Sequence, residues 1–89
     1  MTESITARVT GQVQGVGFRW TTVRELESLR LDGAAENLAD GSVRVTATGA
    51  RDSLPALVDW LNGPDTPGRV RGVGVTWGAA RDAVIDTKN

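Results

Sequence analysis

The sequence predicts a single α+β domain in which two helices cover one face of an antiparallel sheet. Segments with the period-2 pattern of strands and the longer period of helices follow one another in the order β-α-β-β-α-β. The two middle strands are separated by Asp40-Gly41, a dipeptide that strongly favours a hairpin turn. A chain of 89 residues is too short for two independent cores. We therefore expect one domain over residues 1–89, with its core at about 4–86.

The first half of the chain is predicted to form a strand, a loop and a helix. Apolar and polar side chains alternate in residues 4–11, as in a half-buried strand. Residues 11–17 are punctuated by glycines and are expected to form a loop. Residues 18–30 then have helical periodicity, with Gly33 as the stop signal. The apolar face of this helix is expected to contain Val23, Leu26 and Leu29.

The remaining strands lie in the second half of the chain. Residues 33–38 and 43–48 are predicted to pair around the Asp40-Gly41 turn. Residues 70–77 alternate again and predict a fourth strand, and a weaker pattern at 83–85 predicts a fifth strand at an edge of the sheet.

A second helix is predicted between the third and fourth strands. Asp52 or Ser53 is expected to cap its N-terminus, Pro55 falls in its first turn, and residues 62–64 end it. Its apolar residues recur at i, i+3, i+4 and i+7: Leu54, Leu57, Val58 and Leu61. The complete order is that of a ferredoxin-like sandwich, a fold that hosts many unrelated functions.

The composition excludes several classes of function. The chain contains neither cysteine nor histidine. It therefore has no disulfide and no thiolate nucleophile, and it lacks the commonest zinc ligands and the commonest general base. The usual catalytic triads are excluded for the same reason. We expect neither a metal nor any other cofactor.

Charge and hydropathy argue against two kinds of partner. A net charge of -1 and a pI near 5.2 provide no attraction to nucleic acid or anionic membranes. No apolar run approaches the roughly 18 residues of a membrane span, and the first residues lack the pattern of a signal peptide. We expect a cytoplasmic monomer that binds neither nucleic acid nor a membrane.

The loop between the first strand and the first helix has the design of an anion cradle. Gly11, Gly15 and Gly17 permit positive φ and close backbone approach, so that successive N–H groups can face one anion. The helix N-terminus adds a partial positive charge, and Arg19 adds a planar fork of donors suited to phosphate oxygens. These features predict a phosphoryl ligand.

A simpler interpretation is that this loop is only a tight connection, and the spacing alone favours it. The loop is not a Walker A motif, because no Gly-Lys-Ser/Thr follows. It is not a dinucleotide fingerprint either, because the third glycine and a surrounding parallel βαβ unit are absent.

Three stretches of the sequence resemble the acylphosphatase family, and this resemblance favours the anion cradle over the tight connection. They occur in the family's order, and the resemblance as a whole covers roughly residues 5–77. They are Gly11-Gln-Val-Gln-Gly-Val-Gly-Phe-Arg19, then Gly33 to Val43 with Asn37, Asp40 and Gly41, and finally Leu57 to Val73 with Trp60, Gly63 and Pro64.

The resemblance implies a metal-independent hydrolase that cleaves acyl phosphates to a carboxylate and inorganic phosphate. It implies that Arg19 binds the substrate's phosphate and that Asn37 orients the attacking water, whose proton passes to the phosphate. It also implies a cradle of backbone amides from five loop residues: Gln12, Val13, Gln14, Gly15 and Val16. The side chain of Gln14 is expected to stabilise the loop rather than to touch the reaction.

The sequence departs from the family's pattern at two positions near Asn37. Ala34 replaces a bulky aromatic, which we expect to remove buried area near the site, and Glu36 replaces a basic residue. Strand alternation should turn Glu36 to the face opposite Asn37. The segment after Trp77 is also short and lacks the aromatic of the family's last strand.

Other functions remain as alternatives. The chief one is a noncatalytic anion-binding or interaction domain on the same scaffold, as in domains of larger nickel-iron hydrogenase maturation proteins. An RNA-binding domain would carry aromatics on its first and third strands, and this chain has none there. A metal carrier would need the Cys-x-x-Cys that the chain lacks.

Overall fold

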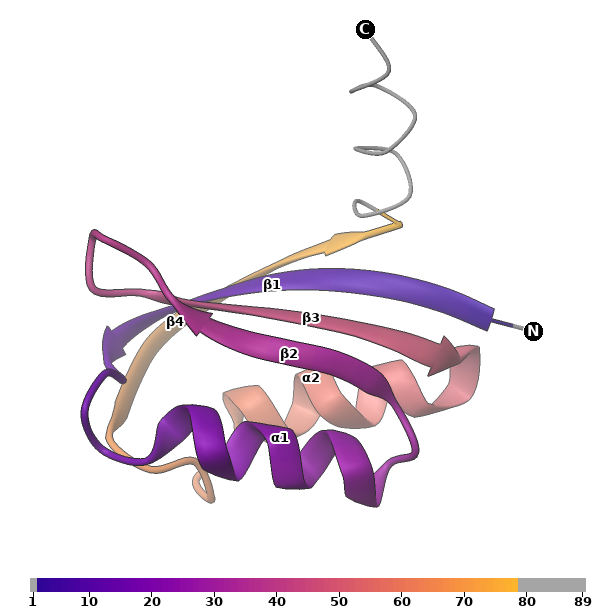
Figure 1. The fold of residues 1–89 in the computed structure, drawn as a ribbon, viewed down its shortest axis with the longest axis horizontal. Helices are drawn as coiled ribbons and strands as arrows, with labels where there is room; N and C mark the ends of the chain where they lie inside the picture. Colours follow the sequence, from indigo (N-terminus) through magenta and orange to yellow (C-terminus); the bar gives the residue numbers. More distant parts are fainter. Residues whose placement is uncertain (1, 79–89) are drawn as a thin grey trace, which may run out of the picture.

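The structure is a computed structural model that describes residues 2–78 of the chain. Figure 1 shows a four-stranded sheet with two helices packed on one of its faces. The elements along the chain are β1 (Thr2–Gln12), α1 (Phe18–Ser28), β2 (Asp32–Asn37), β3 (Val43–Ala50), the short 3₁₀ turn η1 (Arg51–Ser53), α2 (Leu54–Asn62) and β4 (Arg69–Trp77).

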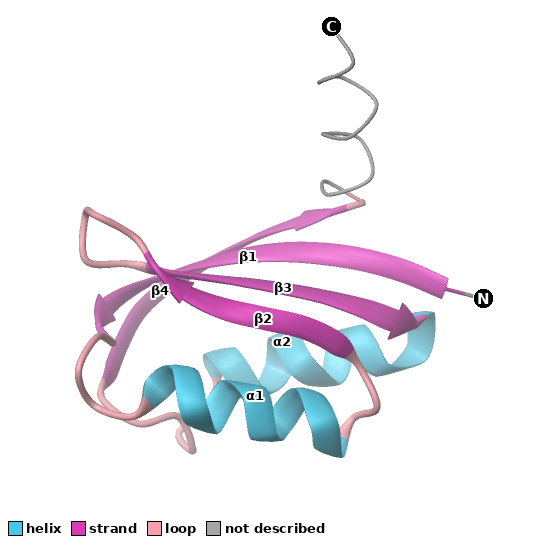
Figure 2. Ribbon diagram, viewed as in Figure 1, coloured by secondary structure: helices cyan, strands magenta, loops and turns pink. Residues whose placement is uncertain are grey.

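The sheet has the strand order β2-β3-β1-β4, and each neighbouring pair is antiparallel. Both helices lie on the same side of it, and within residues 2–78 the other face carries no helix (Figure 2). This is the predicted ferredoxin-like α+β sandwich, and that prediction is confirmed. The fifth strand predicted at 83–85 lies outside the described residues. Neither α1 nor α2 is long and apolar enough to cross a membrane.

The core lies between the sheet and the helices. Successive side chains of a strand point to opposite faces of the sheet, and directly paired residues of an antiparallel ladder share a face. Alternate residues of β1 and β3 therefore point inward together. These inward residues are all apolar and almost fully buried: Ile5, Ala7, Val9, Val43, Val45 and Ala47. Three leucines of α2 complete the layer from the helix side: Leu54, Leu57 and Leu61.

The buried face of α1 differs from the prediction. The residues that point into the core are Phe18, Thr22 and Leu26, whereas Val23 is 38% exposed and Leu29 is only partly buried. The Phe18 ring packs against Trp60 of α2, with ring centroids 6.4 Å apart. Burial of this large side chain sets the rotation of the helix, and the i, i+4, i+8 stripe from Phe18 faces the sheet as a result.

The end of α1 also differs from the prediction. Gly33 is not the stop signal, since the helix ends at Ser28 and Arg30 takes the left-handed conformation, with φ 59°. Gly33 lies inside β2, where a Cβ atom would collide with the carbonyl oxygen of Thr46 in β3. Close strand approach explains the glycine at this position.

The start of α2 is only partly as predicted. Pro55 lies in the first turn and Gly63 is the C-cap. Neither Asp52 nor Ser53 caps the helix through its side chain, because η1 already gives Ser53 helical angles, φ -83° and ψ -21°. An N-cap side chain bonds the helix from an extended backbone, which Ser53 does not have.

Candidate functional site

The loop between β1 and α1 contains two residues in a left-handed backbone conformation that only glycine adopts easily. Gly15 has φ 76°, and Gly17, the N-cap of α1, has φ 82° and ψ 11°. Gly17 supplies no capping side chain, and the first turn of α1 contains no acidic residue. The backbone N–H groups at this end therefore have neither a side-chain cap nor a carboxylate in the first turn to satisfy them.

A hollow of about 220 Å³ opens beside this helix end. Arg19 from the first turn of α1 and Asn37 from the end of β2 both line it, although eighteen positions separate them in the sequence. In Figure 1 the arrowhead of β2 and the start of α1 lie at the same end of the molecule. The other lining residues are Val13, Gly15, Gly17, Phe18 and Trp20.

The predicted cradle residues do not all reach the hollow. Val13 and Gly15 line it, whereas Gln12 is the last residue of β1 and pairs with Arg69 of β4. Val16 is 44% exposed and does not line the hollow. Trp20 is also a lining residue.

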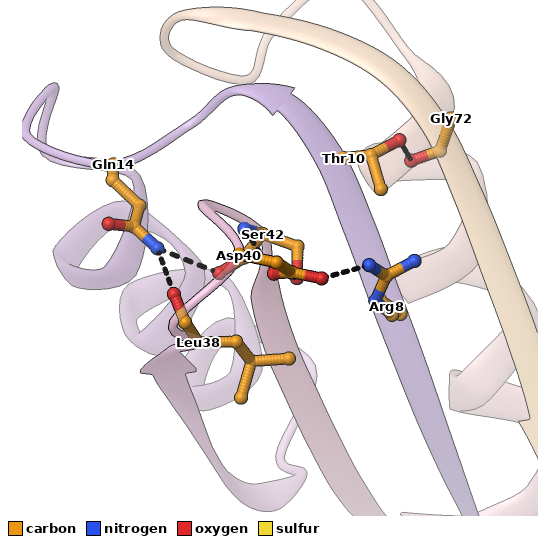
Figure 3. A network of polar contacts seen from close by, with 7 residues as sticks. All are labelled: Arg8, Thr10, Gln14, Leu38, Asp40, Ser42 and Gly72. Carbon is orange, nitrogen blue, oxygen red and sulfur yellow. Dashed lines mark hydrogen bonds and ion pairs between the residues drawn. The ribbon is translucent and has the colours of Figure 1, made fainter.

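Gln14 connects the loop to the hairpin between β2 and β3. Its carboxamide nitrogen donates to the carbonyl oxygens of Leu38 and Ser42, each at 2.9 Å (Figure 3). Asn37 immediately precedes Leu38, so these two hydrogen bonds fix the loop relative to the end of β2 that carries Asn37. The side chain thus lies on the hairpin, as expected of a loop-stabilising residue.

Asp40 holds the same hairpin in shape. Its carboxylate accepts hydrogen bonds from the Ser42 hydroxyl at 2.5 Å and from the Ser42 backbone N–H at 3.0 Å. It also forms an ion pair with Arg8 of β1 (Figure 3). The bonds from Ser42, followed by the guanidinium of Arg8, hold the pKa of Asp40 well below its ordinary value.

The two departures from the family pattern lie on the other face of β2. Glu36 is paired with Arg44 of β3, and its carboxylate lies 3.0 Å from the Arg44 guanidinium. Its charge is directed away from the hollow, as strand alternation predicted. Ala34 pairs with Thr46 and is exposed on this open face. The expectation that Ala34 removes buried area near the site is therefore wrong.

A larger hollow, of about 580 Å³, lies along β1 and β4 and is lined by Gly11, Gln12, Arg69, Val70 and Arg71. It contains neither Arg19 nor Asn37, and none of its lining residues belongs to a helix. Volume alone therefore does not identify the site, and the smaller hollow has the groups suited to a phosphoryl anion.

Comparison with known proteins identifies the family. The family model for acylphosphatase matches residues 5–86. The chain belongs to the acylphosphatase family. A relative from Streptomyces coelicolor named acylphosphatase is 53% identical over 78 residues, which cover 86% of this chain and 84% of that protein.

Solved acylphosphatase structures share the fold. The structure of an acylphosphatase from Coxiella burnetii is 38% identical, with a TM-score of 0.76, and the match covers 85% of this chain and 80% of that one. The acylphosphatase from Bacillus subtilis is 33% identical, also with a TM-score of 0.76, over 86% of this chain and 84% of that one.

Proposed function

We propose that this chain hydrolyses acyl phosphates in the hollow at the N-terminus of α1, with Arg19 and the loop amides binding the phosphoryl group and Asn37 orienting the water. Membership of the acylphosphatase family supports the reaction. The observation that supports the residue roles is the single hollow lined by Arg19, Asn37 and the glycine-rich loop.

The reaction needs positioning and charge stabilisation more than a strong base. The oxygen of the water attacks phosphorus, the bond from phosphorus to the bridging oxygen breaks, and the carboxylate leaves with the bonding electrons. The proton of the water passes to a phosphate oxygen. Arg19 and the N–H groups near Gly17 stabilise the charge on the phosphoryl oxygens, and the Asn37 carboxamide holds the water in line.

This division of roles agrees with the composition of the chain. Histidine and cysteine are both absent, so neither an imidazole base nor a thiolate can take part. A carboxylate is a good leaving group, and an activated substrate of this kind can react without either one.

The test is hydrolysis of benzoyl phosphate in buffer treated with a chelator, with inorganic phosphate as a competitive inhibitor. We expect Arg19→Ala and Asn37→Ala each to lower kcat/KM about a hundredfold or more, the usual loss when one group that stabilises a transition state is removed. Arg51→Ala, which removes an exposed arginine outside the hollow, is the matched control and should keep wild-type activity.

Arg19→Lys sharpens the assignment. An ammonium cannot reproduce the two parallel hydrogen bonds of a guanidinium, so we expect only partial recovery relative to Arg19→Ala. Wild-type turnover by the lysine variant would contradict the proposed role of Arg19. Phosphate binding without any turnover by the wild-type chain would instead favour the noncatalytic anion-binding domain.

The remaining sequence-based expectations complete the proposal. We propose one domain over residues 1–89 that acts as a cytoplasmic monomer, with no nucleic-acid or membrane partner. Sedimentation at micromolar concentration tests the monomer, because a dimer would double the measured mass.

A further inference from the structure

An exposed aromatic residue is among those that line the hollow. Trp20 lines the hollow together with Arg19 and Asn37, and 66% of its surface is exposed. A single exposed apolar side chain is ordinary on a protein surface. The orientation of Trp20 and the group stacked on it distinguish it from Trp77, which is 47% exposed and lines a different hollow.

Helix geometry places Trp20 on the outer side of the hollow. Phe18 is 1% exposed and points into the core. Successive helical residues are about 100° apart, so Trp20 lies about 200° around α1 from Phe18, on the side away from the sheet. Asn37 belongs to the sheet. The hollow therefore has Asn37 on its sheet side and Trp20 on its outer side.

Arg24 stacks on the Trp20 ring from the C-terminal direction. Its guanidinium carbon lies 4.8 Å from the ring centroid, and it is one helical turn further along α1. Helical side chains lean toward the helix N-terminus, so the indole extends over the turn that borders the hollow. The cation–π contact holds the ring in this position.

We propose that Trp20 forms an acyl subsite, which favours acyl phosphates with a flat, apolar acyl group over acetyl phosphate. Phosphoryl transfer is close to in line, so the leaving carboxylate departs opposite the attacking water. With the water on the Asn37 side, the acyl group lies on the outer side, against Trp20. The inference rests on the proposed function, because that function places the water at Asn37.

Binding of two phosphonates tests the subsite without requiring turnover. Phenacylphosphonate and acetonylphosphonate carry a methylene group in place of the bridging oxygen of benzoyl phosphate and acetyl phosphate, respectively. We expect Trp20→Ala to weaken phenacylphosphonate about three- to tenfold more than acetonylphosphonate, the usual contribution of one aromatic pair. Trp20→Phe should retain most of the difference, because a phenyl ring still offers a flat apolar face.

The matched control is Trp77→Ala, which removes the other exposed tryptophan and should leave both dissociation constants at the wild-type value. Equal weakening of the two phosphonates by Trp20→Ala, or no weakening of phenacylphosphonate, would overturn the subsite. So would binding of neither phosphonate to the wild-type chain. Selective weakening in a chain that hydrolyses neither acyl phosphate would uphold the subsite and refute the proposed function, so the two failures are distinguishable.

Discussion

The backbone groups at the two ends of α1 differ in how they are hydrogen-bonded. At the C-terminal end the backbone N–H groups of Arg30 and Leu31 donate to the carbonyl oxygens of Glu27 and Leu26, at 3.0 and 2.8 Å. This pair of bonds is a Schellman motif, which satisfies the last carbonyl groups of a helix. At the N-terminal end, Gly17 has no capping side chain.

The comparison shows where the fold leaves hydrogen-bonding capacity unused. Both ends contain a left-handed residue, Gly17 with φ 82° and Arg30 with φ 59°. Only the N-terminal end borders the hollow that contains Arg19 and Asn37. If the N-terminal end binds an anion, as we propose, its N–H donors must remain available, whereas the C-terminal end can satisfy its carbonyl groups within the chain.

Among the changes at the ends of α1 and in the hairpin, Gly17→Ala is expected to have the largest effect on stability. A Cβ atom at Gly17 meets no other atom within 4 Å, so the cost is only backbone strain, about 1–2 kcal/mol of unfolding free energy. If the chain relieves this strain by turning the loop, the N–H groups turn away from the hollow. We therefore also expect weaker inhibition by inorganic phosphate and a lower kcat/KM for benzoyl phosphate.

Gly41→Ala is the matched control for this variant. Gly41 has φ 95°, equally open surroundings and no place in the hollow. It should show a similar loss of stability in urea unfolding with a smaller change in phosphate inhibition. Equal changes in phosphate inhibition for both variants would show that general strain, rather than the position of the helix end, controls anion binding.

The second prediction concerns the C-terminal end. Arg30→Gly relieves the strain of a left-handed arginine, while the more flexible unfolded chain offsets part of that gain. We expect a net stabilisation of about 0.5–1 kcal/mol and unchanged hydrolysis of benzoyl phosphate. The urea midpoint and kcat/KM measure the two effects. Destabilisation by Arg30→Gly would mean that the arginine side chain stabilises the fold by more than the strain of its left-handed backbone destabilises it.

The order of elements was predictable from the sequence because it rests on local patterns. Strand alternation and the Asp40-Gly41 turn depend on near neighbours in the chain. The buried face of α1 was not predictable in this way. Leu26 belongs to both candidate stripes, and the contact between Phe18 and Trp60 that selects one of them joins residues far apart in the sequence.

The residues of the candidate site also differ in whether local sequence patterns could predict them. Arg19 and the glycines before it are adjacent in sequence, so their pattern could raise the hypothesis of an anion site, which the family resemblance then favoured over a tight connection. The presence of Asn37 in the same hollow as Arg19 depends on β2 lying in the right register at the sheet edge, which is a non-local property. Glu36 could be assigned to the opposite face because alternation along one strand is local.

The smallest effect on stability is expected from Asp40→Asn, which tests how the hairpin beside the site is stabilised. The pKa of Asp40 is lowered by hydrogen bonds from Ser42 and by Arg8. A carboxyl whose folded-state pKa is lowered stabilises the fold above its unfolded pKa, about 3.9, and that contribution falls as the pH drops toward the folded value. The urea midpoint of the wild-type chain should therefore exceed that of Asp40→Asn at pH 7, and the gap should narrow progressively below about pH 4.

Asp65→Asn is the control, because within residues 2–78 the Asp65 side chain makes no hydrogen bond or ion pair. Its urea midpoint should lie close to that of the wild-type chain at pH 7. The Asp40 side chain is half exposed, and solvent screens its interactions, so the gap should be smaller than the effects at Gly17 and Arg30. A gap that is constant with pH would show that Asp40 acts through the shape of the turn rather than through its charge.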